Sequence, residues 1–317
     1  MEAQKKFYIN VSGGLGYNLA LARVITHYGD DYEFYIKSPY WDVFRACEKV
    51  KHVYKETEGR DFIFDAKRDN AIIIQHRLYD MSDFIYKKLN YTQAWCELLG
   101  LPCVDPENTE GTTLSELALN PCRYFPVTTK QIDTVINDIT QKGYEDFILI
   151  QFWGGQSPIG TDFNQPYTYE NEPLKRTYPV ELAQDFINLF KKDNPKTAII
   201  QYSLPNEPSL AGCENYLYPY MTYYELSKHP MCKGAVTIDS SLAHLISGNC
   251  KVLTIWAHSH PTSFGYSFNK NIIQNCDRSE ILYFTELGPS GTRIDYISPE
   301  ELLREAEAYL CDSLPDV

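Results

Sequence analysis

The sequence predicts an α/β protein made of two Rossmann-like domains, with mainly parallel sheets and a cleft between the domains. Short apolar, β-rich segments alternate with amphipathic helical segments along the chain, which is the pattern of βαβ units. The pattern runs twice, and in each half a β-rich segment leads directly into glycines, at Gly13-Gly14 and at Gly154-Gly155. The chain of 317 residues also exceeds the length at which a single hydrophobic core usually divides.

The first half begins with an apolar strand at residues 7–11 that ends in a glycine loop. A helical pattern follows this loop through Leu19, Ala22 and Ile25. The further elements expected are a strand at 32–36, a helix at 41–47, strands at 61–64 and 70–75, and helices at 92–99 and 130–141. The pattern restarts after residue 142, so we place the first domain at residues 1–142.

The second half repeats the succession of strand, glycine loop, helix and strand. Its helix at 179–192 starts with proline, which is favoured in a first helical turn, and carries an apolar stripe. The other elements expected are strands at 146–152, 197–202, 235–238 and 251–256, a short helix within 219–226 and a final helix at 299–310. We therefore place the second domain at residues 143–295 and a terminal helical segment at 296–317.

The segment GAVTIDSSLAHLISG, residues 234–248, carries the strongest functional signal. A buried strand is followed by Asp239, an expected N-cap, and by a helix that opens with Ser240 and Ser241. The N–H groups of a first helical turn attract anions, and the two hydroxyls lie beside them. His244 shares this helix face, and its ring is expected to lean back over the anion pocket. The segment therefore predicts a phosphate site, the alternative being a capped helix that binds nothing.

Composition and charge argue against several classes of function. The formal net charge is −13 and no long basic run occurs, so neither nucleic acid nor a polybasic membrane contact is expected. No apolar stretch reaches the roughly 20 residues of a transmembrane helix, and no signal peptide is present at the N-terminus, so a cytoplasmic location is expected. His258 and His260 lack further ligands, so no metal site is expected.

Several segments in the right order along nearly the whole chain match one known family. VTIDSSLAHL matches a D-[ST]-G-x-x-H-L motif, with Ser241 in place of its glycine. Arg176-Thr177-Tyr178-Pro179 matches a basic-x-aromatic-Pro entry into a helix, and YINVSGGLGYNLALARVI matches an opening strand and glycine loop. By these segments the chain resembles a divergent member of the heptosyltransferase-like glycosyltransferases, a family 9-like group with the GT-B fold.

The resemblance implies inverting transfer of a sugar from a nucleotide-diphosphate sugar to an acceptor hydroxyl, without a metal ion or a cofactor. The acceptor would be a glycan, a lipid-linked molecule or another hydroxyl compound. The resemblance also implies that the terminal helix packs back toward the first domain. The residues implied around the donor and its phosphates are Gly14, Gly16, Trp153, Gly154, Arg176, Asp239, Ser240, Ser241 and His244.

The expected catalytic base departs from the family pattern. The family commonly has an aspartate directly after the opening glycine loop, where this chain has Tyr17. A phenol with a pKa of about 10 is a poor base at neutral pH, so we expect a carboxylate of the first domain in its place. The candidates are Asp80, Asp83, Asp65 and Glu97, with Tyr17 itself as a further one, and His76 and Arg77 at a strand end are expected on the acceptor side.

Other hypotheses stay open beside an active glycosyltransferase. A chain without the usual base could bind a sugar nucleotide and catalyse nothing. Another nucleotide-dependent α/β enzyme, such as an epimerase or a reductase, is the third hypothesis, although the loop Gly13–Gly16 lacks the GxGxxG spacing of dinucleotide sites. At single positions, Trp153 could belong to the core, and His244 could orient Asp239 instead of contacting a phosphate.

Overall fold

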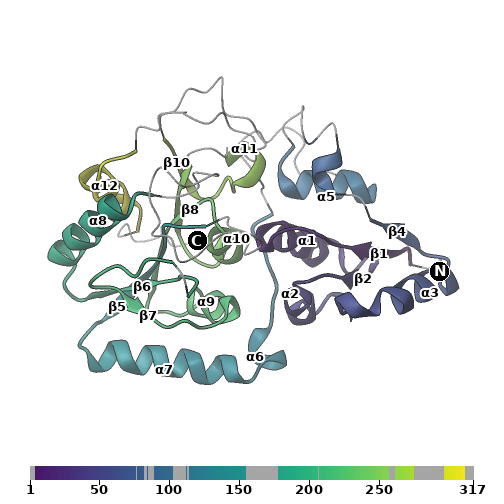
Figure 1. Cartoon of the computed structure of the whole chain (residues 1–317), viewed down its shortest axis with the longest axis horizontal. Coiled ribbons are helices and arrows are strands. Elements are labelled where there is room, and N and C mark those ends of the chain that lie inside the picture. The colour runs from purple at the N-terminus through teal and green to yellow at the C-terminus, as the bar shows by residue number, and fades with distance from the viewer. Residues whose placement is uncertain are drawn as a thin grey trace. The chain divides into compact units, whose positions relative to one another are not determined.

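The chain forms two units of parallel β-sheet with flanking helices, which confirms the predicted α/β class (Figure 1). The computed structural model describes residues 4–75, 77–81, 84, 89–102, 112, 114–154, 178–205, 207–256, 261–274 and 296–310. Unit 1 consists of Met1–Pro126 and Thr262–Tyr266, and unit 2 of Val127–Pro261 and Ser267–Val317. The boundary expected at residues 142/143 differs from this division, because helix α7 (Val127–Gln141) belongs to unit 2, where it packs on α9 (Tyr220–Leu226).

Unit 1 has a four-stranded parallel sheet in the order β3-β2-β1-β4. Its strands are β1 (Lys6–Asn10), β2 (Glu33–Lys37), β3 (Val50–Tyr54) and β4 (Ile72–Ile74). Its helices include α1 (Leu15–Tyr28), α2 (Trp41–Ala46), α3 (Gly59–Arg68), α5 (Tyr91–Leu99) and α6 (Pro121–Tyr124). Since β1 pairs with both β2 and β4, the glycine loop that follows β1 lies at the carboxyl edge between their ends.

The prediction of a strand at residues 61–64 is wrong, because these residues lie within helix α3. The buried residues of this helix are Phe62 and Ala66, whose spacing of four places them on one face. The strand of this region is β3, which lies earlier in the chain and buries only Tyr54. Because β3 is an edge strand with polar, exposed side chains, it lacks the apolar pattern by which strands are found.

Unit 2 has a six-stranded parallel sheet in the order β10-β9-β8-β5-β6-β7. Its strands are β5 (Asp146–Gln151), β6 (Thr197–Gln201), β7 (Glu214–Asn215), β8 (Cys232–Ile238), β9 (Val252–Trp256) and β10 (Lys270–Ile273). Its helices include α7, α8 (Val180–Asp193), α9, α10 (Ser241–Ile246) and α12 (Pro299–Leu310). The strands β5 and β8 are neighbours in the middle of the sheet, so the segments that follow them start at the same edge.

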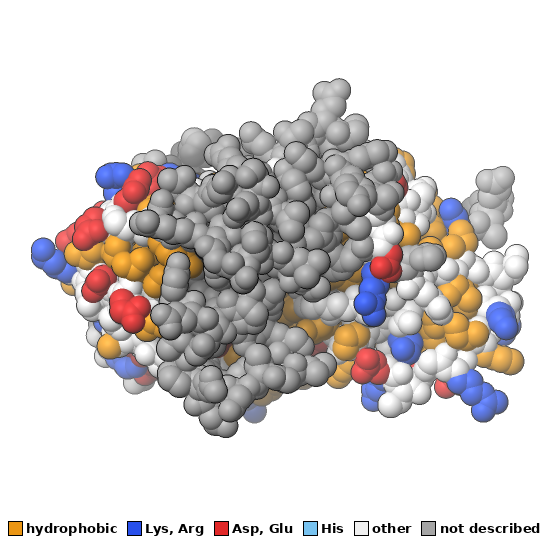
Figure 2. Space-filling model, turned by 45° about the horizontal axis from the view of Figure 1, so that its top comes forward, with side chains coloured by type: hydrophobic (Ala, Val, Ile, Leu, Met, Phe, Trp, Pro, Cys, Tyr) orange, Lys and Arg blue, Asp and Glu red, His pale blue; other side chains and the backbone are white. Residues whose placement is uncertain are grey.

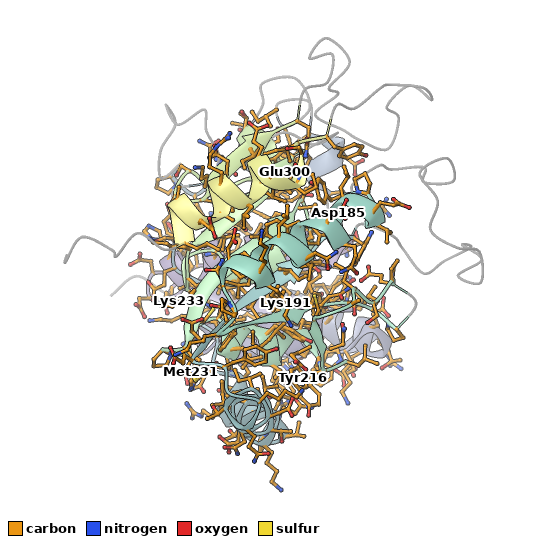
Figure 3. All side chains as sticks on the ribbon, turned by 90° about the vertical axis from the view of Figure 1, so that its left-hand side faces the viewer. Asp185, Lys191, Tyr216, Met231, Lys233 and Glu300 are labelled. Carbon is orange, nitrogen blue, oxygen red and sulfur yellow. The ribbon has the colours of Figure 1, made fainter. Side chains whose placement is uncertain are left out.

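The terminal helix α12 packs on α8 and β8, and Figure 3 shows the two helices side by side. Its residues Leu302, Ala306 and Leu310 join Phe186 and Ile187 of α8 in the apolar core of unit 2. An amphipathic helix with an apolar stripe needs such a partner, and α8 carries the matching stripe. The contacts described for α12 therefore lie within unit 2, whereas we expected it to pack back toward the first domain.

The surface carries charges of both signs. On the face drawn in Figure 2, basic and acidic side chains of the described residues are interspersed. Elsewhere Lys142 illustrates the pairing of charges, with its Nζ 2.8 Å from Asp138 and 2.6 Å from Glu214. Within the described part of the chain, no helix is both long and apolar enough to span a membrane.

Candidate functional site

Two loops of unit 2 meet at the carboxyl edge of its sheet. Since β5 pairs with β8 in parallel, Trp153-Gly154 and Asp239-Ser240 follow neighbouring strand ends. A Cβ atom placed on Gly154 would lie 3.1 Å from the Cβ of Ser240, closer than side chains normally approach. The absence of a side chain at Gly154 therefore allows the two segments to touch, and the structure brings these four predicted site residues together.

The first turn of α10 is closed by groups of the protein itself. Ser240 is the N-cap, in place of the expected Asp239, and its Oγ accepts a hydrogen bond from the N–H of Ala243 (3.5 Å). The Oε1 of Gln151 accepts a hydrogen bond from the N–H of Leu242 (3.1 Å). Two of the N–H groups that we expected to bind an anion are thus satisfied within the chain. In this turn Ser241 is half-buried, while Asp239 and Ser240 are buried.

Asp239 and His244 form a buried pair at this turn. The Nε2 of His244 lies 3.7 Å from the Oδ1 of Asp239, and each residue is 5% exposed. The two side chains carry opposite charges whenever the imidazole is protonated, and burial strengthens their attraction. The arrangement agrees with the alternative in which His244 orients Asp239, instead of an imidazole that lies over an open anion pocket.

Trp153 lies in the core of unit 2. It is 1% exposed and belongs to the same apolar cluster as Phe152 and Phe186. A fully buried indole contributes mainly through the apolar area that it removes from water. The core alternative therefore describes Trp153 better than a contact with a ligand does.

The segment around Arg176 is described only from Tyr178 onward, so Arg176 lies outside the described residues. The Tyr178 hydroxyl donates a hydrogen bond to the carbonyl of Ile297 (2.7 Å), which ties the start of α8 to the segment before α12. Burial raises the pKa of Tyr178, and the charges of Glu300 and Asp185 raise it further. Figure 3 labels these two acidic residues on α12 and α8.

Glu207 is a carboxyl group after β6, at the same sheet edge, that the sequence analysis missed. Burial raises its pKa to about 7, although its Oε2 accepts a hydrogen bond from the N–H of Leu204 (2.8 Å). Gln201, 1% exposed, holds the loop by accepting from the N–H of Leu210 (3.0 Å) and donating to the carbonyl of Pro208 (2.7 Å). An acidic residue in a proline-containing loop directly after a buried strand was the signal available.

The glycine loop of unit 1 is held by a buried asparagine that the sequence analysis also missed. Gly14 is the N-cap of α1, Gly16 is half-buried inside that helix, and Gly13 has a φ of +132°, which residues with a side chain rarely adopt. Asn18 is fully buried; its Nδ2 donates to the carbonyl of Gly14 (2.9 Å) and its Oδ1 accepts from the Ser38 hydroxyl (2.6 Å). A polar residue in the otherwise apolar first part of α1, Leu15–Ala22, was the signal.

Tyr17 is buried between α1 and α5. Its hydroxyl accepts a hydrogen bond from the N–H of Leu78 (2.9 Å), and the residue is 3% exposed. Its ring centroid lies 4.9 Å from that of Trp95 and 6.0 Å from that of Tyr91, both in edge-to-face arrangements. These contacts give Tyr17 a structural role in joining the glycine loop to the segment after β4.

Asp80 lies close in sequence to this junction. It ends the short 3-10 helix Leu78–Asp80, whose first N–H is bonded to Tyr17, and it is exposed. Arg77, directly before this helix, is exposed as well. Both residues therefore follow β4, next to the strand that leads into the glycine loop.

The other acidic candidates differ in their surroundings. Asp65 pairs with Arg68 (2.7 Å) and accepts a hydrogen bond from the Tyr54 hydroxyl (2.8 Å), so it stabilises α3 and β3. Glu97 is exposed on α5, and Asp83 and His76 lie outside the described residues. Among the residues that the structure does describe, no group of three His, Cys, Asp or Glu side chains could hold a metal ion.

Comparison with known proteins gives matches among solved structures only. No protein-family model matches the sequence, and no curated protein matches it. The glycosyl transferase of family 9 from Veillonella parvula is 12% identical, with a TM-score of 0.60 over 98% of this chain and 98% of that one. ADP-heptose LPS heptosyltransferase II from E. coli is 12% identical, with a TM-score of 0.56 over 97% and 98% of the two chains.

A third match is a dodecameric, iron-containing heptosyltransferase, TibC from enterotoxigenic E. coli, solved with ADP-D-β-D-heptose. It is 11% identical, with a TM-score of 0.51 over 97% of this chain and 74% of that one. At these identities the likeness is one of fold, and it extends over nearly the full length of this chain. The chain therefore has the GT-B type fold of the heptosyltransferases, which is the fold that its sequence segments predicted.

Proposed function

We propose that this protein is an inverting glycosyltransferase that moves a sugar from a nucleotide-diphosphate sugar to an acceptor hydroxyl. The observation that carries the proposal is the likeness of fold over 97–98% of the chain to heptosyltransferases and a family 9 glycosyltransferase. Among these neighbours, one is named for ADP-heptose and another was solved with it. An ADP-sugar is therefore the first donor to test.

The donor diphosphate would bind at the carboxyl edge of the unit 2 sheet. Ser241 is the half-buried member of the turn after β8, and its hydroxyl and N–H suit a phosphate oxygen. Arg176 would supply a cation for the departing diphosphate, which such fixed charges and dipoles stabilise without a metal ion. The buried pair of Asp239 and His244 would hold this turn in position.

The acceptor would bind to unit 1, at the edge where the glycine loop and the residues after β4 lie. Asp80 is a carboxylate that the structure describes at this edge. It is exposed and therefore available to remove a proton from a hydroxyl. Arg77 beside it would contact the acceptor.

Titration calorimetry with nucleoside diphosphates tests the donor site. We expect a nucleoside diphosphate, ADP first among ADP, GDP and UDP, to bind, and NAD(P) not to bind. His244→Ala should weaken this binding roughly ten- to a hundredfold, because Asp239 loses its buried partner and the turn that would bind the diphosphate loses its position. His229→Ala is the matched control, since this half-buried histidine of the same unit stacks on Phe147 and accepts a hydrogen bond from the N–H of Met231, away from the turn after β8.

Two outcomes would contradict the proposal. Binding of NAD(P) in place of nucleoside diphosphates would favour another nucleotide-dependent enzyme. Unchanged affinity in a folded His244→Ala variant would remove this residue from the donor site.

The second candidate function is a sugar-nucleotide-binding protein without catalysis, which the structural role of Tyr17 favours. In that case the diphosphate binds, yet no sugar, lipid or peptide acceptor accelerates consumption of the donor. Donor turnover measured with an acceptor panel separates the two candidates. Adding a chelator to the same assay tests whether the transfer proceeds without a metal ion.

A further inference from the structure

A glutamine at the centre of the unit 2 sheet connects the two loops of the candidate site. Gln151 is the last residue of β5 and is 2% exposed. Its Oε1 accepts a hydrogen bond from the N–H of Leu242, 3.1 Å away and 91 positions later in the chain. The side chain thus crosses from the end of one strand to the helix that follows the neighbouring strand.

The bond of Gln151 decides which groups of the turn are open to a ligand. The N–H of Leu242 is bonded to Gln151, and the N–H of Ala243 is bonded to Ser240 Oγ (3.5 Å). The N–H of His244 donates to the Ser240 carbonyl (3.3 Å). Ser241 is half-buried, and among the described residues of this turn it is the one at whose N–H and hydroxyl we place the phosphate.

The position of Ser241 then depends on two contacts made from β5. The first is the Gln151 bond to Leu242, one residue later. The second is the contact of Gly154 with Ser240, where an added Cβ would approach to 3.1 Å. Together they hold the turn on both sides of Ser241, and a shift of even about 1 Å of a binding group reduces a precisely oriented interaction severely.

We infer that Gln151 is a positioning residue for the donor diphosphate: it acts through Leu242 to hold Ser241 in place and adds no further negative charge beside Asp239. This inference rests on the proposed function. A neutral amide suits the task, because an aspartate or glutamate would accept the same hydrogen bond but would repel a diphosphate across a medium of low dielectric constant.

Two substitutions of Gln151 separate its effect on the position of the turn from the effect of a charge at this residue. Gln151→Leu removes the acceptor and should weaken binding of ADP at least tenfold. Gln151→Glu keeps an acceptor of the same shape and adds a carboxylate. It should weaken binding of ADP at pH 8 at least tenfold, with recovery toward the wild-type affinity as the pH falls and the carboxyl becomes protonated. The wild type should show no such recovery between pH 8 and pH 5.5.

Gln274 offers a matched control in the same unit. It is 3% exposed, and its Oε1 accepts one backbone hydrogen bond, from the N–H of Ile297 (2.6 Å). Gln274→Leu and Gln274→Glu should therefore perturb folding in a comparable way while the turn at Ser241 stays intact. Calorimetry on the folded fraction, checked by thermal unfolding of each variant, compares the four proteins with the wild type.

The outcomes distinguish this inference from the function on which it rests. If the wild type binds no nucleoside diphosphate, the proposed function fails. If the wild type binds ADP and a folded Gln151→Leu binds it equally well, the positioning role is overturned. Equal binding by Gln151→Glu at pH 8 overturns the part of the inference that concerns charge. The positioning role is also overturned if the Gln274 variants lose as much affinity as the Gln151 variants. Should Gln151→Leu fail to fold, the pH dependence of Gln151→Glu decides the matter, because this variant retains the hydrogen bond to Leu242: ADP binding that does not recover as the pH falls would overturn the inference.

Discussion

At the scale of single residues, Tyr17 and Asp80 should separate stability from catalysis. Tyr17→Phe leaves the N–H of Leu78 without its acceptor, so we expect the free energy of unfolding to fall by about 1–3 kcal/mol. Under the proposed function, donor turnover by the folded variant should stay near that of the wild type. Asp80→Asn should do the opposite, with unchanged stability and turnover lowered roughly a hundredfold or more. Urea unfolding and a donor-turnover assay measure the two effects.

Asp61→Asn is the control for the Asp80 variant, because Asp61 is also an exposed aspartate of unit 1 and lies on α3. A loss of turnover in Tyr17→Phe, together with full activity in Asp80→Asn, would show that the phenol takes part in the chemistry.

Glu207 should make stability depend on pH. Its pKa is raised by burial to about 7, above the usual 4.5, so the folded chain holds a proton that the unfolded chain releases. The ionised Glu207 carboxylate is unfavourable in its buried position and lowers the free energy of unfolding. This effect is absent below about pH 4.5, grows as the pH rises and is complete above about pH 7. Glu207→Gln should therefore stabilise the protein at pH 8 by up to about 3 kcal/mol and leave it unchanged at pH 4. Urea unfolding at both pH values measures this change in stability. An equal stabilisation at pH 4 would show that ionisation of the buried Glu207 is not its cause.

Residue identity alone predicted part of the site. The sequence placed Asp239, Ser240 and His244 at one strand end because capping and helix periodicity are local properties. It assigned the N-cap to Asp239, whereas the structure has Ser240 there, and it could not show that Gln151 takes one N–H of the turn. That bond joins residues 91 positions apart, and no local pattern encodes such a pairing.

At the scale of elements, the two glycines before α1 should respond differently to alanine. Gly13 has a φ of +132°, and an added Cβ would lie 3.2 Å from the Tyr17 ring, so Gly13→Ala should cost about 1–3 kcal/mol. Gly14 has a φ of −69° and open space around it, so Gly14→Ala should cost less than about 1 kcal/mol. Denaturant unfolding of both variants measures the difference, and equal costs would mean that backbone strain at Gly13 does not matter.

The elements that the sequence predicted well are those buried on one regular face. Helix α8 begins one residue after its predicted start, because Pro179 and the apolar stripe mark it clearly. The strands β3, β7 and β10 were missed, since all three lie at sheet edges and each buries at most one side chain. Helix α3 was taken for a strand because its apolar residues Phe62, Ile63 and Phe64 are contiguous, although only Phe62 is buried.

At the scale of the whole molecule, the repeated pattern predicted two units but not the path of the chain through them. The segment Thr262–Tyr266 belongs to unit 1, although the residues before and after it belong to unit 2. The Phe264 ring lies 4.8 Å from that of Tyr91, and the guanidinium of Arg23 lies 4.7 Å from the Tyr266 ring centre. The segment joins unit 1 through a few side chains. A segment of five residues is too short to show a periodic pattern in the sequence.

This return has a consequence for synthesis on the ribosome. When residue 126 emerges, the aromatic partners Phe264 and Tyr266 of unit 1 have not been made, and the buried Arg23 has no ring to cover it. The missing five residues arrive only after the intervening part of unit 2, on the order of ten seconds later at ordinary elongation rates. Unit 1 therefore cannot complete its native packing as a nascent domain, and its last step of folding must wait for the downstream half of the chain.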